Sequence, residues 1–213
     1  MAMAEHNSER WKRLIGPLAG AAVGFAVGAI VGGGRLVRIY DWTTEWTIDA
    51  PRSEVFRVLS APEEQRHWWP SMVVERVEPL PDNPDGRIIT YRVLQAPSVR
   101  RIAAPFILVS TIADVEHDRR TRAVVTGDLA GVLDTLLFDR PDGGTRVVFH
   151  WYTRVTNPVM NALGFVMTTV FRASHDHVMR EGEAGLRAYL AARLGHGQAL
   201  AASAMSETPQ AGS

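Results

Sequence analysis

The chain has 213 residues, which is enough for one domain of ordinary size with extensions at its ends. Lysine plus arginine and aspartate plus glutamate each number 23, so the formal net charge is zero and no nucleic-acid partner is expected on electrostatic grounds. The sequence has no cysteine, which excludes disulfides, thiolate metal sites and a cysteine nucleophile.

The first distinctive segment, residues 14–34, has no charged or hydrogen-bonding side chain. As a helix rising about 1.5 Å per residue it would span about 30 Å, the thickness of a bilayer's hydrocarbon core. Trp11 and Tyr40 stand where interfacial aromatic residues anchor such helices. We therefore expect a single-pass membrane helix after a short tail, residues 1–13. Basic residues on its two sides are balanced, so they do not indicate its orientation.

Glycine recurs every fourth residue along this segment. On a helix that spacing forms a groove where another backbone can approach closely, which predicts a homo-oligomer through Gly16, Gly20, Gly24, Gly28 and Gly32. Two other interpretations stay open. A cleaved signal peptide would have a shorter apolar run and an A-x-A-like site. A tail lying on the domain or on a membrane surface would have a polar face.

After this segment the pattern becomes that of a folded domain, residues 40–194. A half-buried strand is predicted because an inward-facing, mostly apolar set of residues alternates with a polar set. The inward-facing set is Trp42, Thr44, Trp46 and Ile48. A short helix follows from Arg52 until Pro62 ends it. A second short helix is predicted from Glu63 to about Trp69.

Six further strands and one long helix complete the domain. The strands are predicted at about 72–78, 87–94, 106–115, 121–128, 132–140 and 145–154, separated by turn-forming residues. The helix begins after Asn157-Pro158 and reaches about Leu194. Residues 195–213, rich in Ala, Ser, Gly and Gln, are predicted to be disordered. The long helix is the only element large enough to cover one face of the sheet, and a gap between them could hold an apolar ligand.

Four stretches resemble the SRPBCC (START/Bet v 1-like) superfamily, in particular its polyketide cyclase/dehydrase-like branch. They are TTEWTIDAPRSEVFRVLS (43–60), RHWWPSMVVERVE (66–78), DGGTRVVFHWYTRVTNP (142–158) and FRASHDHVMREGEAGL (171–186). The resemblance implies an α+β helix-grip fold, in which a curved seven-stranded antiparallel sheet wraps around a long C-terminal helix. It also implies a central cavity for lipids, sterols, isoprenoids or polyketides, and a cytoplasmic domain. It implies catalysis only weakly, because the superfamily has no universal catalytic residue.

Few residues have the chemistry for a reaction. Asp176 beside His175 could orient an imidazole as a general base, but adjacent helical residues point about 100° apart. His175 and His177 cannot share a helix face, so no metal site is predicted. His175 and Tyr91 remain the candidates for an acid or base. Asp176 is expected to be exposed.

Strand alternation and the helical period predict which side chains of the strands and of the long helix face the interior. The resemblance implies that the second short helix, with Trp68 and Trp69, flanks the mouth of the cavity. Packing alone could account for each of them, and a cavity requires only that packing leaves a gap. The expected ligand-contacting residues are Trp46, Trp68, Trp69, Tyr91, Phe149, Trp151, Met167, Phe171, His175 and Val178.

The sequence therefore favours a membrane-tethered domain that binds or transfers a hydrophobic small molecule. A polyketide cyclase or dehydratase is one alternative. A membrane assembly module that oligomerises through its glycine face is another. No cofactor or metal is expected for any of them.

Overall fold

The computed structural model describes residues 38–99 and 104–206, with side chains for all of these except residues 159, 162–170 and 197–206. The glycine-patterned segment 14–34 lies outside the described residues, so its predicted membrane helix and its predicted association face are untested. Within residues 38–99 and 104–206, no helix is both long and apolar enough to cross a membrane.

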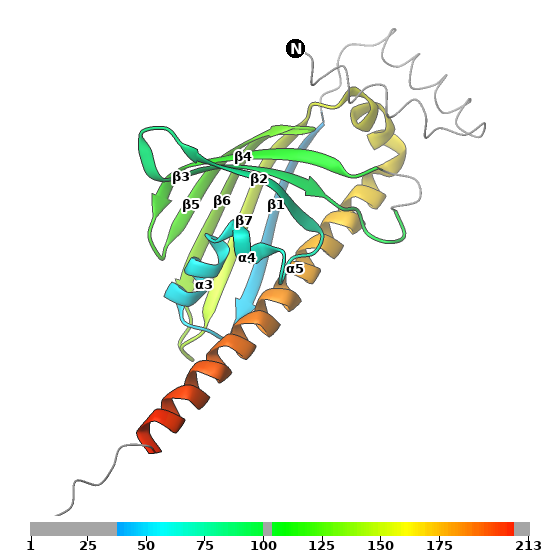
Figure 1. Cartoon of the computed structure of the whole chain (residues 1–213). Helices are drawn as coiled ribbons and strands as arrows, with labels where there is room; N and C mark the ends of the chain where they lie inside the picture. Colours follow the sequence, from blue (N-terminus) through cyan, green and yellow to red (C-terminus); the bar gives the residue numbers. More distant parts are fainter. Residues whose placement is uncertain (1–37, 100–103, 207–213) are drawn as a thin grey trace, which may run out of the picture.

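A single antiparallel sheet of seven strands forms one layer of the domain (Figure 1), in the order β1-β7-β6-β5-β4-β3-β2. Each strand after β2 pairs with the one before it, and β1 closes the order beside β7. All seven predicted strands are present, and most begin or end within a few residues of the prediction. Their bounds are β1 Ile39–Ile48, β2 Met72–Leu80, β3 Asn83–Val93, β4 Phe106–Glu116, β5 Arg120–Gly127, β6 Leu129–Asp139 and β7 Thr145–Val155.

Two short helices, α3 (Arg52–Leu59) and α4 (Pro62–Gln65), follow β1. Helix α4 is shorter than predicted: it ends at Gln65, whereas the predicted helix reached about Trp69. The amide nitrogens of Trp68 and Trp69 both donate to the Gln65 carbonyl, at 3.1 and 2.8 Å, in a turn that directs both indoles inward.

The long helix α5 (Pro158–Ser206) runs across the sheet and projects past its edge (Figure 1). It continues beyond the predicted end at Leu194, so residues 195–206, predicted to be disordered, are helical. Alanine, the strongest helix former, is the commonest residue of this stretch, and that local preference outweighs Gly195 and Gly197. Composition alone did not distinguish an Ala-rich helix from a disordered tail.

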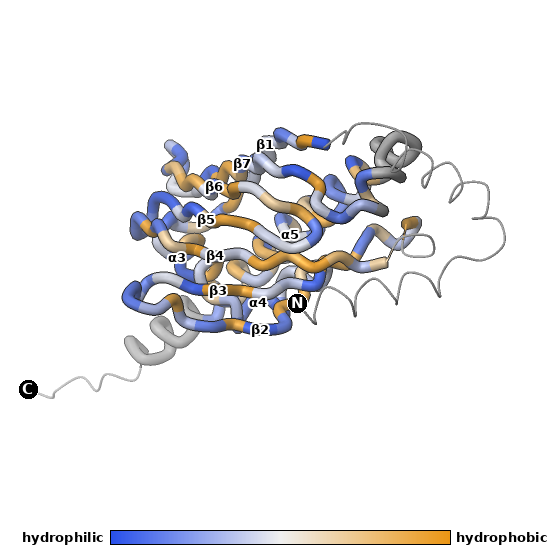
Figure 2. The backbone as a smooth tube through the Cα atoms, turned by 90° about the horizontal axis from the view of Figure 1, so that it is seen from above, coloured by the Kyte–Doolittle hydropathy of each residue, from blue (hydrophilic) through white to orange (hydrophobic). Residues whose placement is uncertain are grey.

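The sheet has one covered face and one free face, as its sequence alternation predicts. Figure 2 shows hydrophobic and hydrophilic positions interleaved along the strands. Trp46 and Val147 are buried on the inner face, whereas Val124 and Tyr152 on the outer face are each 52% exposed. On the outer face Arg122 binds Asp134 through two hydrogen bonds of 2.7 and 2.9 Å, and this pairing lowers the pKa of the Asp134 carboxyl.

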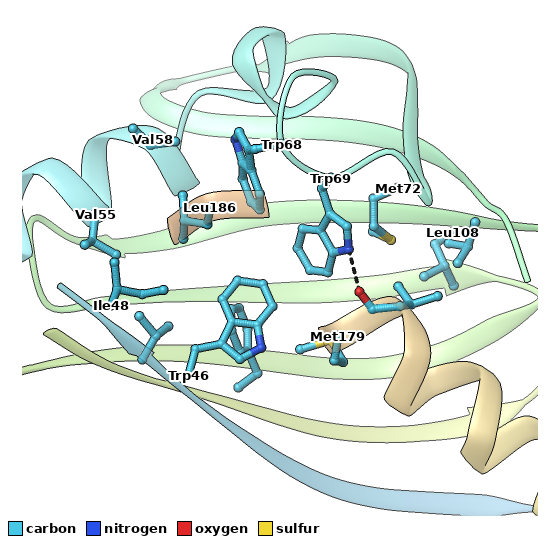
Figure 3. Close-up of a cluster of buried hydrophobic side chains, with 14 of the residues drawn as sticks. Trp46, Ile48, Val55, Val58, Trp68, Trp69, Met72, Leu108, Met179 and Leu186 are labelled. Carbon is cyan, nitrogen blue, oxygen red and sulfur yellow. Dashed lines mark hydrogen bonds between the residues drawn. The ribbon is translucent and has the colours of Figure 1, made fainter. Parts of the chain in front are cut away.

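Helix α5 is held against the inner face by hydrogen bonds and by two glycines. The Trp69 indole nitrogen donates to the Val178 carbonyl at 2.9 Å (Figure 3). The Glu181 carboxylate accepts from the Ser71 amide at 2.9 Å, and the Glu183 carboxylate accepts from the Thr47 amide at 3.0 Å. Gly182 and Gly185 provide the close approach. An added Cβ at Gly182 would stand 2.6 Å from the Trp69 ring.

Candidate ligand cavities

Two cavities lie on the inner face of the sheet. The first, here called the helix cavity, has a volume of about 80 Å³ and is lined in part by α5. The second, the sheet cavity, has a volume of about 220 Å³ and is lined by the sheet, α3, α4 and the segment after α4. Four side chains line both: Trp69, Met72, Leu108 and Trp151. The two cavities are therefore neighbours separated by an apolar partition. Each alone is smaller than the usual range of roughly 300–1,000 Å³ for ligand pockets, and the two together reach only the lower end of that range.

The helix cavity is mostly apolar. Its lining residues are Tyr40, Trp42, Trp69, Met72, Val93, Gln95, Phe106, Leu108, Leu129, Trp151, Thr153, Val155, Met160, Phe171, Ser174, His175, Val178 and Met179. Two of its polar residues are bonded to each other, because the Ser174 hydroxyl donates to the Gln95 side-chain oxygen at 2.5 Å. The same hydroxyl accepts from the Ala96 amide at 3.1 Å. This pair fixes the segment after β3 against α5.

Aromatic rings form one wall of the helix cavity. The Tyr40 and Trp42 rings stack with centroids 4.6 Å apart, and the Trp42 and His175 rings lie 4.3 Å apart. Trp42 is also the cross-strand partner of Trp151, between β1 and β7. Side chains at such paired positions lie side by side on one face of a sheet.

His175 contributes a neutral imidazole to this wall. Burial lowers the pKa of His175, and the neighbouring Asp176 carboxylate opposes that shift only in part. The imidazole Nδ1 is 3.4 Å from Asp176 Oδ1, which is a long contact. This contact was not predicted, because adjacent residues of a helix were expected to point away from each other. Asp176 is exposed, as predicted.

Three polar atoms of this cavity have no hydrogen-bond partner among the described residues. They are the Tyr40 hydroxyl, the Trp151 indole nitrogen and the His175 Nε2, and all three are buried. A buried polar atom without a partner costs free energy. All three atoms are covered by neighbouring protein atoms, so the surface that the cavity presents to a ligand remains almost entirely apolar.

The sheet cavity is more polar, especially at its exposed end. Asp85, Arg87, His117 and Thr121 lie at that end, where His117 Nε2 is 3.4 Å from Asp85 Oδ2. Deeper inside, the Tyr91 hydroxyl donates to the Gln65 side-chain oxygen at 3.3 Å. Burial raises the pKa of Tyr91 far above its ordinary value, so its phenol stays protonated.

Most of the predicted ligand-contacting residues line a cavity. Trp69, Trp151, Phe171, His175 and Val178 line the helix cavity, and Trp68, Trp69, Tyr91, Phe149 and Trp151 line the sheet cavity. Trp46 lines neither and is 1% exposed, because it packs edge-on against Trp69 and Phe149 in the core. The side chain of Met167 lies outside the described residues. The two candidate acid–base residues, His175 and Tyr91, lie in different cavities.

Several cavity residues were not predicted from the sequence. Tyr40 was expected at a membrane interface, whereas it belongs to β1 and lines the helix cavity. Tyr40 lies an even number of residues before Trp42 and Trp46, so all three share one face of the strand, and this spacing could have identified it. Gln95 lies in the segment after β3 and Phe106 is the first residue of β4, and no local pattern marks them. The described residues contain no group of three or more His, Asp or Glu side chains placed to hold a metal ion.

Solved structures show where the fold recurs. TTHA0849 from Thermus thermophilus is similar with a TM-score of 0.54 and 16% identity, over 70% of this chain and 99% of that one. A conserved protein from Geobacillus kaustophilus has a TM-score of 0.51 and 10% identity, over 70% of this chain and 95% of that one. The Zhui aromatase/cyclase from Streptomyces sp. R1128 has a TM-score of 0.50 and 16% identity, over 74% of this chain and 96% of that one. At these identities the likeness concerns the fold alone.

A match to a family model shows the family of this chain, although no match was found among curated proteins. The family model described as "Polyketide cyclase / dehydrase and lipid transport" matches residues 41–191, which run from β1 through most of α5 and include nearly all of the cavity walls. The chain therefore belongs to the polyketide cyclase/dehydrase and lipid transport family.

Proposed function

We propose that this domain binds or transfers a hydrophobic small molecule, of the lipid, isoprenoid or polyketide-like kind, without chemically changing it. The observation that supports this most strongly is the pair of adjoining cavities between the sheet and its covering helices. Family membership points to the same class of ligand. Apolar surface buried by a ligand contributes about 25 cal/mol per Å², so a mostly apolar lining favours binding by shape and burial.

The arrangement of polar residues favours binding over cyclase activity. A cyclase or dehydratase needs an acid and a base that reach one substrate. His175 and Tyr91 line different cavities, and the Tyr91 hydroxyl is bonded to Gln65. A cyclase remains the second candidate function because His175 places a neutral imidazole in a cavity wall. On that alternative, His175→Phe abolishes turnover of a polyketide-like substrate while the substrate still binds.

Blocking the sheet cavity tests the binding function. Ala123 faces this cavity from β5 and is 4% exposed, whereas its neighbour Val124 points to solvent. We expect Ala123→Trp to weaken binding of the apolar dye N-phenylnaphthylamine by at least about tenfold, because the indole occupies the space of the dye. Dye fluorescence and energy transfer from tryptophan measure the binding. Val124→Trp, on the outer face of the same strand, is the control. Equal affinity in both variants would place the dye elsewhere and contradict the proposal.

We further propose that residues 14–34 tether the domain to a membrane in a single pass, with association of chains through the glycine face. A charged residue near the middle of a membrane helix costs about 2.5–3.5 kcal/mol. We expect the full chain to float with phosphatidylcholine vesicles in a density gradient and Val23→Asp/Val27→Asp to remain at the bottom. Val124→Asp, in the folded domain, should float like the wild type. Flotation of the double variant would refute the tether.

The predicted glycine face needs its own test. Leucine at Gly20 and Gly24 would fill the groove that allows close approach of two helices. We expect the variant Gly20→Leu/Gly24→Leu to lose oligomers in detergent solution, as measured by light scattering coupled to size-exclusion chromatography. An unchanged molar mass would show that the glycines are not an association surface.

A further inference from the structure

The first described residues of the chain lie at one end of the sheet, here called the proximal end. Antiparallel pairing brings together there the start of β1, the end of β7 and the starts of β4 and β6 (Figure 1). Helix α5 begins at the same end, because the Asn161 side-chain oxygen accepts from the Arg38 amide at 3.1 Å. The Val155 amide donates to the Arg38 carbonyl at 2.9 Å. The opposite, distal end carries α3 and the turns between β2 and β3, β4 and β5, and β6 and β7.

The chain enters the proximal end directly from the segment proposed to cross the membrane. Residues 14–34 end four positions before Arg38. Four residues of extended chain span at most about 14 Å, so an inserted tether holds the proximal end close to the bilayer. The distal end lies the length of a strand away, which for the 11 residues of β7 is roughly 36 Å. The tether fixes which end is near the membrane, but not whether that end touches it.

The surface of the proximal end suits contact with lipid. Ile39 is 57% exposed, and its cross-strand partner Arg154 on β7 is also exposed. An apolar side chain beside a cation matches a layer where acyl chains meet anionic headgroups. Residues 158–171, the first turns of α5, contain no charged residue. The proximal end can therefore approach a bilayer without removing many charges from water.

The chain connections at the two ends differ in charge. In the described parts of the proximal connections, between β3 and β4, β5 and β6, and β7 and α5, Asp128 is the only charged residue. Its carboxylate accepts from the Ile107 amide and from the Asn157 side-chain amide, both at 2.9 Å. The distal connections after β1, β2, β4 and β6 contain more acidic than basic residues: Asp49, Asp82, Asp118 and Asp142 against Arg119 and Arg140. An anionic membrane surface therefore repels the distal end more than the proximal end.

The two cavities are arranged along the same axis. Residues at the proximal ends of β1, β4, β6 and β7 and in the first turn of α5 line the helix cavity: Tyr40, Phe106, Leu129, Val155 and Met160. Asp85 and His117, at the distal end, line the sheet cavity. The almost entirely apolar cavity is thus the one closer to the tether, and the charged cavity entrance is the one farther from it.

We propose that the proximal end docks on an anionic membrane surface, which places the helix cavity next to the lipid and points the charged entrance of the sheet cavity away from it. This inference rests on the proposed tether. Weak attraction is sufficient, because a tethered domain meets the membrane at a high effective concentration. In this orientation an apolar ligand passes between the bilayer and the helix cavity without exposing its apolar surface to bulk water.

Fluorescent labels at the two ends of one strand test the orientation. The sequence has no cysteine, so one introduced cysteine carries a single label. Thr126→Cys places the label at the proximal end of β5, and Arg119→Cys places it just before the distal start of that strand, both at exposed positions. Seven residues separate the two positions, roughly 23 Å along a strand. The full chain is reconstituted in vesicles of phosphatidylcholine and phosphatidylglycerol that contain a lipid with a nitroxide on its headgroup. We expect this short-range quencher to act severalfold more strongly on the label at 126 than on the label at 119.

A charge change at the proximal end tests the contact itself. In the chain labelled at 126, we expect Ile39→Glu/Arg154→Glu to reduce quenching to the level at 119, while the chain still floats with the vesicles through its unchanged tether. Phe138→Glu/Arg146→Glu is the matched control. Phe138 is also an exposed apolar residue of the sheet, and Arg146 is its cross-strand partner near the distal end. This control makes the same change in net charge and should keep the quenching of the wild type.

The outcomes separate docking from the tether. Equal quenching of the two labels in chains that float would overturn docking and leave the tether intact. A difference that survives Ile39→Glu/Arg154→Glu, or that is lost equally in Phe138→Glu/Arg146→Glu, would overturn the assignment to the proximal surface. If the unmodified full chain failed to float, the tether and the docking inference would both be lost.

Discussion

Gly185→Ala should destabilise the domain by about 3 kcal/mol or more, and the melting temperature should fall by about 6–12 °C. An added Cβ at this position would stand 1.8 Å from the carbonyl oxygen of Trp68. That atom belongs to the backbone, so the clash cannot be relieved by rotating a side chain. Either α5 or the segment after α4 must move, and both contribute walls to the cavities.

Two other glycines of the same helix provide a graded comparison. At Gly182 the Cβ would meet side-chain atoms of Trp69 and Trp46, at 2.6 and 2.8 Å, so Gly182→Ala should cost less than Gly185→Ala. Gly195 has nothing within 4 Å, and Gly195→Ala should be neutral or stabilising by up to about 1 kcal/mol through helix propensity. Thermal unfolding followed by circular dichroism gives the ranking. If Gly185→Ala melted like Gly195→Ala, the close packing of α5 against the Trp68 backbone would be incorrect.

The sequence was most informative where structure depends on a short local period. Alternation along β1 and β7 identified Trp46 and Trp151 as inward-facing, and the helical period placed Ser174 and Val178 on the buried face of α5. Both patterns are set within a few residues, so tertiary context changed only the element ends. The end of α5 was predicted too early, because an Ala-rich stretch has the composition of a tail and the propensity of a helix.

The cavities were less predictable because they depend on contacts between distant segments. Alternation shows that Trp46 and Trp151 face inward, but not that Trp46 is packed on all sides while Trp151 borders empty space. Tyr40 and Gln95 reach the helix cavity only because β1 and the segment after β3 meet the same stretch of α5. Period-2 spacing can place Tyr40 on the inner face of β1, but no sequence spacing connects β1 and the segment after β3 to α5, so the cavity between these segments cannot be found from a local pattern.

Trp69 connects the fold to the proposed function. Its indole lies in the partition between the two cavities and donates to the Val178 carbonyl of α5 (Figure 3). Its ring also lies against Trp68 and Trp46, with centroids 5.3 and 5.2 Å away. One side chain thus contributes to core packing, to the attachment of α5 and to the separation of the cavities.

Removing this indole should therefore have two effects that can be measured independently. We expect Trp69→Ala to lower the free energy of unfolding by about 3–5 kcal/mol, the range for truncating a large buried aromatic residue. The same change removes much of the partition, so a single elongated space should replace the two cavities. A rod-shaped apolar dye such as diphenylhexatriene, which fluoresces when shielded from water, should bind at least about tenfold more tightly to the variant than to the wild type.

Trp68→Ala is the control that separates joined cavities from a loosened fold. Trp68 is also buried, at 2% exposure against 6% for Trp69, but it lines only the sheet cavity. Its truncation should cost a similar free energy of unfolding and enlarge that cavity without opening the partition. Near-ultraviolet circular dichroism verifies that both variants keep fixed tertiary packing. If diphenylhexatriene bound both variants equally well, general loosening would account for the gain. A gain confined to Trp69→Ala would instead mean that this indole limits the length of ligand that the domain accepts.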